Sequence, residues 1–274
     1  MLAKKRLKGA LANSPYFTAG IGLPVLKGDL ILLDFNAKIK ETGSLFDTTS
    51  EELARKEKLY KEGRTYEPLL VAVGEGWIPK GLDEALVGKE IGVQETIEIP
   101  PEKGFGQRDP SKIKLIPLRR FAAQKVTPYP GLQLDVDGRP ATIRSVGAGR
   151  VQVDYNPPLA GKTLVYDFVV KKILSTAEEK IQALIHRRLP LTDVSKVNVT
   201  FDGKAVSIEL PEESFLMEGL QLAKRGIASD LHKFLTDIDT VNFIERYVRR
   251  AQQTAASPAA LATQERASAP EDKK

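Results

Sequence analysis

Alternation of apolar and polar residues predicts that the first part of the chain is rich in strands. Residues 30–40 begin as an apolar run and then alternate, with Phe35, Ala37 and Ile39 on one face, which is typical of a strand. The same pattern predicts further strands at 68–73, 92–99 and 164–174. These four segments favour a sheet with one face on a core.

Two helices are predicted between these strands. Thr49-Ser50-Glu51-Glu52 has the form of a capping box, which places a helix N-terminus at Thr49, and Gly63 is where that helix should end. A shorter helix is expected over 82–86. The first segment, 1–27, carries five Lys and Arg and no acid. Its apolar middle is interrupted by Pro15, Gly20 and Pro24, so a disordered extension is favoured over a secretory signal.

Residues 107–154 form a separate pattern of short strands. An Asp137-Gly138 pair within it is a strong hairpin signal. The expected elements are strands at 113–116, 132–136, 141–146 and 150–154 and a short helix over 117–124. The segment holds nine Lys and Arg against four Asp, so it is a small basic β-rich module.

From residue 175 the pattern changes to mixed helix and strand. The expected elements are a helix at 176–189, a hairpin of 197–201 with 205–210, a helix at 214–235 that tolerates Gly219 and Gly226, and a strand at 240–248. The tail at 251–274 has the composition of a disordered segment.

Composition excludes several classes of site. The chain of 274 residues has no cysteine and two histidines, so disulfides, thiolate metal sites and His-rich metal sites are ruled out. No stretch of 18 or more predominantly apolar residues is present, so no membrane span is expected. We predict a cytoplasmic protein with no cofactor and no metal.

Three segments in sequence resemble the FKBP family of peptidyl-prolyl cis-trans isomerases. They are Phe46-Asp47-Thr48-Thr49, the stretch from Val71 to Leu86 containing Gly74-Glu75-Gly76-Trp77-Ile78-Pro79, and Lys103-Gly104-Phe105-Gly106. A fourth segment, Asn156-Pro157-Pro158-Leu159-Ala160-Gly161-Lys162-Thr163-Leu164, resembles the return segment of the SlyD-like branch. The resemblance covers residues 28–174 and, with the C-terminal extension, is similar to the long archaeal type.

This resemblance implies an α+β fold: an FKBP antiparallel sheet wrapped on a short helix, an inserted small β-rich flap domain, and a C-terminal α+β domain. The expected division is an N-terminal extension at 1–27, a prolyl isomerase domain at 28–106 and 155–174, a flap at 107–154, a C-terminal domain at 175–250 and a tail at 251–274.

The resemblance also implies a set of prolyl-site residues. By family position, the catalytic residues are Phe35, Phe46, Asp47, Phe105 and Tyr166, and the substrate-binding residues are Leu69, Trp77, Ile78 and Leu82. Leu82 replaces an indole that often forms the pocket floor, and we expect Trp77 to refill the pocket from another direction. Phe35 and Phe105 stand where the family usually has tyrosines, so two hydroxyls are missing. Aromatic residues on alternating strand positions are also ordinary core residues.

The basic insert has two interpretations. As a SlyD-like flap it would bind extended apolar segments of unfolded clients through Val126, Tyr129, Leu132, Leu134 and Val136. The same side chains could instead be the module's own small core. SlyD has a metal-binding histidine tail, which this chain lacks.

The function expected from the resemblance is isomerisation of X-Pro bonds in folding proteins, with client capture by the flap. Its partners would be unfolded polypeptides and proline-containing peptides. The first alternative is a holdase chaperone on an FKBP scaffold with little isomerase activity. RNA or ribosome binding through the basic segments is a second alternative, but no interleaved aromatic RNA motif supports it. Apolar residues of the C-terminal domain would fit a homodimer interface or ordinary core packing.

Overall fold

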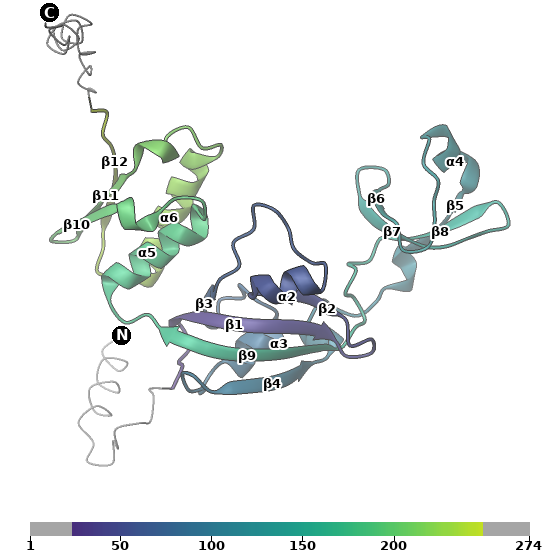
Figure 1. The fold of residues 1–274 in the computed structure, drawn as a ribbon, viewed down its shortest axis with the longest axis horizontal. Helices are drawn as coiled ribbons and strands as arrows, with labels where there is room; N and C mark the ends of the chain where they lie inside the picture. The colour runs from purple at the N-terminus through teal and green to yellow at the C-terminus, as the bar shows by residue number, and fades with distance from the viewer. Residues whose placement is uncertain (1–23, 249–274) are drawn as a thin grey trace, which may run out of the picture.

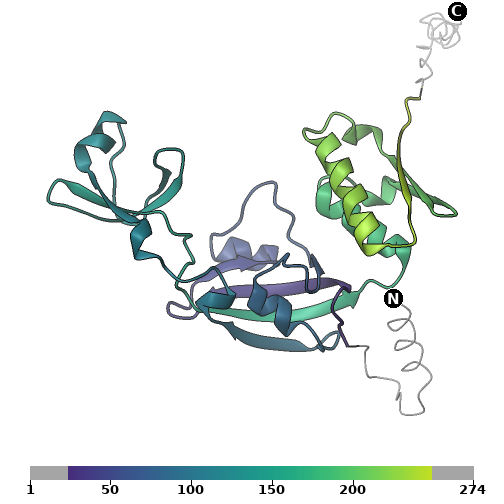
Figure 2. The same cartoon turned by 180° about the vertical axis from the view of Figure 1, so that it is seen from behind.

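Residues 24–248 are described by a computed structural model, in which the chain forms three sheets arranged in a row (Figure 1). The central sheet lies between a smaller sheet of the inserted segment and a third sheet near the C-terminus. Both flanking units rise from the same side of the central sheet, as the reverse view also shows (Figure 2). The expectations for 1–23 and for the tail at 251–274 lie outside the described residues.

The named strands of the central sheet all pair antiparallel, as the resemblance implies, and β1 and β9 are its longest members. Its strands run in the order β2-β1-β9-β4, and β3 pairs with the first half of β1. The bounds are β1 Leu30–Ile39, β2 Leu45–Thr48, β3 Leu69–Ala72, β4 Gln94–Ile99 and β9 Leu164–Ile173.

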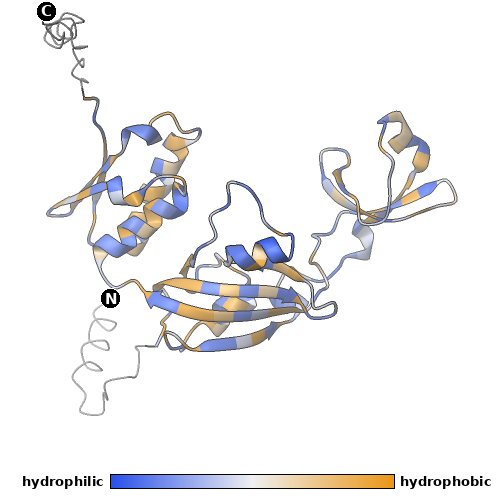
Figure 3. Ribbon diagram, viewed as in Figure 1, coloured by the Kyte–Doolittle hydropathy of each residue, from blue (hydrophilic) through white to orange (hydrophobic). Residues whose placement is uncertain are grey.

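One face of the central sheet packs on the short helix α3 (Lys80–Ala85). Leu82 of α3 and Leu86 just after it are fully buried there, beside Leu33 and Phe168 of the sheet. The alternation of hydrophilic and hydrophobic residues along β1 and β9 is visible in Figure 3. Val25 is also fully buried in this core, so the chain contributes to the central unit before residue 28.

Helix α2 (Glu51–Lys56) is shorter than the sequence indicates, and the predicted capping box is wrong. Its N-cap is Ser50, whose hydroxyl accepts from the Leu53 N–H at 3.3 Å. Thr49 instead accepts from the Phe35 N–H at 3.0 Å and so belongs to the sheet edge. The helix ends at Lys56, because the following residues turn away, with Lys58 at a φ of 57°.

The inserted segment folds into a four-stranded antiparallel sheet, ordered β5-β8-β7-β6, with the helix α4 beside it. Asp137 and Gly138 both have positive φ, which is the hairpin turn that their sequence predicts. The turn η1 Pro101–Lys103 precedes the insert. The elements of the insert are η2 Pro110–Lys112, β5 Ile113–Pro117, α4 Leu118–Ala123, β6 Gln133–Asp135, β7 Pro140–Gly147 and β8 Arg150–Asp154.

A polar cluster ties the two connections of this insert together. Asp154 is 1% exposed, and it accepts from the Arg108 guanidinium and from the Asn156 backbone N–H, the latter at 2.9 Å. Burial by itself would raise the pKa of Asp154, but these hydrogen bonds outweigh it and hold that pKa below its usual value. Asn156 also bonds both the N–H and the carbonyl of Asp109, so entering and leaving strands are held side by side.

Several basic side chains of the insert are paired within it. Arg120 meets Asp137, while Arg108 and Arg144 both meet Asp154. These pairs reduce the charge that the excess of Lys and Arg offers to an outside partner.

The C-terminal residues form a three-stranded sheet covered by two helices. In this sheet β10 and β11 are antiparallel, whereas β11 and β12 are parallel. The elements are α5 Ala177–Arg188, η3 Val194–Lys196, β10 Asn198–Asp202, β11 Ala205–Leu210, η4 Glu212–Ser214, α6 Leu220–Phe234 and β12 Thr240–Glu245.

The helix predicted over 214–235 begins later than expected. Gly219 has a φ of 76° and is the N-cap of α6 rather than an interior residue. The segment before it is the single 3-10 turn η4. Glycine adopts this left-handed backbone easily, but a residue inside a helix cannot have it. The helix therefore begins after Gly219.

The C-terminal unit and the central sheet share one apolar core. Leu30, Leu70 and Ala72 of the central sheet are buried in the same cluster as Ile181, Leu184 and Ile227 of α5 and α6. A polar contact of His186 with Glu67 and an ion pair of Lys233 with Glu75 cross the same boundary. None of the helices within residues 24–248 has the length and apolar composition needed to cross a membrane.

Candidate active site

Three strands of the central sheet and one turn bring four aromatic rings together. Phe46 lies edge-on to Tyr166 and to Phe105, with ring centroids 6.0 Å and 6.5 Å apart, and Phe35 lies 5.7 Å from Tyr166. The register of β1 causes this meeting, because Ala37 is paired with Tyr166 on one side and with Asp47 on the other. We call Phe35, Phe46, Phe105 and Tyr166 the aromatic cluster. The structure thus brings together four of the residues that were predicted for the prolyl site.

The aromatic cluster grades from buried to exposed. Tyr166 is 3% exposed and Phe35 is 7% exposed, whereas Phe105 on the turn is 41% exposed. Burial, aided by the nearby Asp47 carboxylate, raises the pKa of Tyr166 well above its usual value. Its hydroxyl therefore stays protonated at any physiological pH, and the cluster offers an apolar surface that is open on the Phe105 side.

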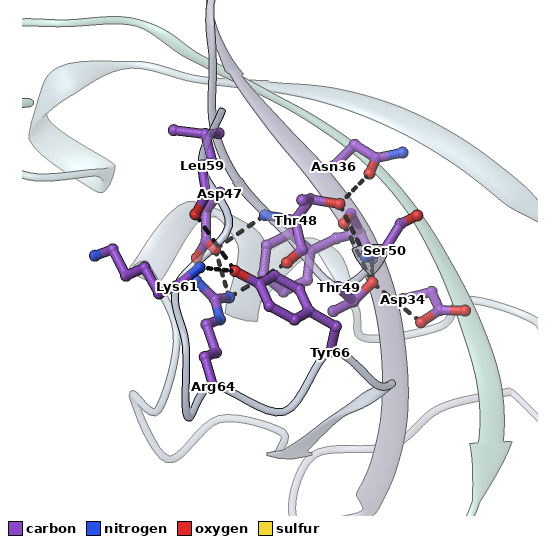
Figure 4. A network of polar contacts seen from close by, with 11 residues as sticks. Asp34, Asn36, Asp47, Thr48, Thr49, Ser50, Leu59, Lys61, Arg64 and Tyr66 are labelled. Atoms are coloured by element: carbon purple, nitrogen blue, oxygen red, sulfur yellow. Dashed lines mark hydrogen bonds and ion pairs between the residues drawn. The ribbon is translucent and has the colours of Figure 1, made fainter. Parts of the chain in front are cut away.

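Asp47 stands beside this surface and is held by a polar network (Figure 4). Its Oδ1 accepts from Arg64 at 2.6 Å and from the Thr48 N–H at 2.9 Å. Thr48 donates its hydroxyl to Asn36 at 2.6 Å, and Thr49 donates to Asp34 at 3.1 Å. The carboxylate is consequently fixed in place, at the point where β2 ends.

Sequence reasoning missed Arg64 and the loop that carries it. Tyr60 and Tyr66 stack with ring centroids 5.5 Å apart, and the Arg64 guanidinium lies 5.1 Å from the Tyr66 ring. The Tyr66 hydroxyl accepts from the Lys61 N–H at 2.9 Å, which closes the loop. The sequence does offer a signal for this loop, namely two tyrosines with five residues between them and basic side chains nearby. The helix predicted up to Gly63 covered part of that segment, so the signal was not used.

The segment before α3 is shaped by a buried carboxylate. Asp83 is 7% exposed and accepts from the N–H groups of Gly74 and Gly76 at 2.7 Å and 3.0 Å. This holds the turn that leads to Ile78, whose side chain packs against the central core. No acceptor for the Ile78 N–H lies among residues 24–248. Leu82 is fully buried in the same core.

Trp77 does not join the aromatic cluster, contrary to the sequence expectation. Its indole lies edge-on to Phe234 of α6, with ring centroids 5.6 Å apart. The Arg187 guanidinium of α5 stacks over it at 3.7 Å. The prediction assumed that a large ring before α3 fills the vacant place of the family indole. The ring instead packs between the central sheet and the C-terminal unit. The sequence had not indicated where the C-terminal unit lies relative to this segment.

Leu69 is the first residue of β3. It is 40% exposed and lines a cavity of about 650 Å³ together with Phe35 and Asp47. Leu69 therefore shares this cavity with two residues of the candidate site.

The five residues predicted to bind clients in the insert are divided by the structure. Val136 is 5% exposed and belongs to the insert's core, and Val126, Leu132 and Leu134 pack against that core. Only Tyr129 among the five is well exposed, at 58%. Four of the five residues therefore fit the second interpretation, in which they form the insert's own small core. Leu115 and Val146, which the sequence did not single out, are exposed apolar residues of this unit.

The missing hydroxyl at Phe105 gives a direct test of the aromatic cluster. Phe105→Tyr is expected to leave kcat/KM on a prolyl tetrapeptide unchanged or to raise it by up to about threefold, because a phenol can donate to a substrate carbonyl without changing the ring's position. Phe105→Leu is the matched variant that keeps apolar bulk without the ring. A large loss in Phe105→Tyr would show that the turn carrying this ring is arranged differently and has no room for the hydroxyl.

Comparison with known proteins places these features in a family context. The family model described as FKBP-type peptidyl-prolyl cis-trans isomerase matches residues 24–119. Models described as FKBP26, IF domain and as FKBP26_C-terminal match residues 114–159 and 177–248.

Individual relatives agree with this match. The short-type peptidyl-prolyl cis-trans isomerase of Methanocaldococcus jannaschii is 37% identical over 155 residues, which is 57% of this chain and 98% of that protein. The FKBP-type isomerase SlyD of Helicobacter pylori is 35% identical over 123 residues, or 44% of this chain and 66% of that protein. A probable FKBP-type 16 kDa isomerase of Pseudomonas fluorescens is 33% identical over 105 residues, or 36% of this chain and 69% of that protein.

Proposed function

Because the chain belongs to the family of FKBP-type peptidyl-prolyl cis-trans isomerases, we propose that the aromatic cluster and Asp47 form its prolyl site. The observation that carries this is the edge-on contact of Phe46 with both Tyr166 and Phe105, directly beside a fixed carboxylate. The enzyme accelerates rotation about X-Pro bonds in proline-containing peptides and client proteins.

The chemistry requires no covalent catalyst and no cofactor. Rotation about the amide must overcome a barrier of roughly 18–20 kcal/mol, which arises from lost resonance. The planar amide is strongly dipolar, whereas the twisted transition state is less polar. A dry aromatic surface therefore favours the twisted form, and a tenfold acceleration corresponds to about 1.4 kcal/mol of that preference.

Polar groups around the aromatic cluster would orient the substrate. The Ile78 N–H, which has no acceptor among residues 24–248, would donate to a substrate carbonyl. The Tyr166 hydroxyl remains a donor because its pKa is raised. Arg64 holds Asp47 from the outside, so the carboxylate cannot swing into the apolar surface. We assign Arg64 a positioning role.

The assay that tests this function uses a short Xaa-Pro peptide and the full chain. Phe46→Ala is expected to lower kcat/KM about tenfold or more, because it removes the ring that joins the other members of the cluster. Phe201→Ala, at an exposed ring of the C-terminal hairpin, is the matched control and should not change the rate. If a folded Phe46→Ala protein keeps wild-type activity, the aromatic cluster is not the prolyl site.

The insert is proposed to capture unfolded clients. Leu115 on the edge strand β5 is 60% exposed, and Tyr129 and Val146 add exposed apolar surface on the same unit. An extended client segment could add to the open edge of β5, while Lys114 and Pro117 on that strand limit pairing between copies. This surface differs from the one predicted from sequence, since only Tyr129 is common to both.

A holdase with little isomerase activity is the second candidate. The feature that favours it is the pair Phe35 and Phe105, which lack the hydroxyls usual in the family. The peptide assay separates the two candidates, because a holdase would suppress client aggregation without accelerating isomerisation of the peptide.

A homodimer through the C-terminal unit stays a prediction. Its buried residues pack in a core shared with the central sheet, and Leu216 and Leu222 are exposed apolar side chains that a second copy could cover.

A further inference from the structure

The cavity lined by Leu69 lies between the central sheet and the C-terminal unit. From the central unit it is bounded by β1, by the loop that follows α2 and by the end of β9, with Leu32, Leu69 and Leu174 among its walls. From the C-terminal unit it is bounded by α5, where Ala183 and His186 line it, and by Val194. The His186–Glu67 pair connects the two walls.

Its size and lining suit a peptide. A volume of about 650 Å³ lies within the range of sites that hold small ligands, roughly 300–1,000 Å³. Its exposed surface is mostly apolar, and charged groups of both signs stand at its rim, including Lys172 and Glu179. A neutral, apolar side chain of an extended chain fits this lining better than a charged one does.

The cavity is continuous with the candidate prolyl site. Phe35 and Asp47 belong to both, so a peptide whose proline lies on the aromatic cluster has its neighbouring residues within reach of Leu69 and Ala183. An extended chain advances about 3.3 Å per residue, so a residue two or three positions from the proline lies roughly 7–10 Å from it, which is the reach that we assign to the cavity.

Resting on the proposed prolyl site, we propose that this cavity is a client subsite, which takes an apolar side chain two or three residues from the proline. The C-terminal unit would then form one wall of the enzyme's substrate site. A chain ending close to the proline could not reach it, whereas an unfolded protein always can.

The test measures the activity of the full chain on five peptides. One is a prolyl tetrapeptide, and the other four carry a three-residue extension containing either leucine or serine, at the N-terminal or the C-terminal end. Wild-type kcat/KM is expected to be about tenfold higher with leucine than with serine on one of the two ends, the size expected for burying one leucine side chain. Ala183→Phe fills the cavity and should abolish this leucine preference, with the tetrapeptide rate unchanged.

Ala177→Phe is the matched control, since Ala177 is an exposed position of the same helix outside the cavity. It should keep the leucine preference. If Ala183→Phe does not fold, the smaller Ala183→Leu should reduce the preference in part.

The outcomes separate this inference from the function beneath it. An inactive wild type on the tetrapeptide would refute the prolyl site itself. An active wild type without leucine preference on either end, or a preference that Ala183→Phe retains, would overturn the subsite alone. A leucine preference that emerges only after removal of residues 249–274 would show that the chain's own tail occupies the cavity, and would also overturn it.

Discussion

Excising residues 107–154 is expected to leave tetrapeptide isomerisation within about twofold of the full chain and to slow catalysed refolding of a proline-limited protein about 100-fold. Capture of an unfolded chain raises the effective concentration of its prolyl bonds at the site, and gains of this kind reach 10² or more. All four rings of the aromatic cluster and Asp47 lie outside the excised segment. The measurement is the rate of each reaction at equal enzyme concentration.

The structure makes this excision practicable. The Gly106 carbonyl accepts from the Gly161 N–H at 2.8 Å, so the two ends of the insert begin close together. Tyr155 packs against the insert's core and would be uncovered, so Tyr155→Ser should accompany the deletion. Phe46→Ala in the full chain is the control, because it should slow both reactions together. A folded excised protein that catalyses refolding as well as the full chain would contradict the flap's role in capture.

Much of the architecture could be predicted from the sequence because the period of apolar residues is local information. The alternation in 30–40 corresponds to β1. The pair Asp137-Gly138 forms the predicted hairpin turn, because both residues adopt the positive φ values that such a turn requires. The aromatic cluster could be assembled in advance only by resemblance, because its members come from β1, β2, β9 and a turn. Their meeting depends on strand register, which no single segment encodes.

The misplacements have tertiary causes. Thr49 is an acceptable N-cap by residue type, but the sheet edge takes its hydroxyl, so the cap moves to Ser50. In the insert, Val126, Leu132 and Leu134 satisfy the pattern of a client groove and of a core equally well. A small unit must bury its few large apolar residues to be stable, and the core interpretation prevails there.

Replacing Phe234 with alanine is expected to uncover Trp77 and to lower the free energy of unfolding of the C-terminal unit by about 2–3 kcal/mol. This is below the range for a fully buried ring, because Phe234 is half-buried. Trp77 is the one tryptophan in the whole chain, so its emission reports on its own surroundings. Loss of the edge-on ring should move that emission to longer wavelength, and denaturant unfolding followed by far-ultraviolet circular dichroism should show the destabilisation.

The decisive comparison is with Phe46→Ala, which removes a ring from the aromatic cluster. The sequence expectation placed Trp77 in the prolyl pocket, and in that arrangement Phe46→Ala would shift the emission while Phe234→Ala would not. The contacts with Phe234 and Arg187 require the opposite result. Arg187→Ala should act in the same direction as Phe234→Ala, with a smaller shift, because a stacked guanidinium on a partly exposed ring contributes only about 0.5–1 kcal/mol. Since Trp77 directly precedes Ile78, an indole held by α5 and α6 also means that the C-terminal unit restrains the segment whose N–H we propose as a donor to the substrate.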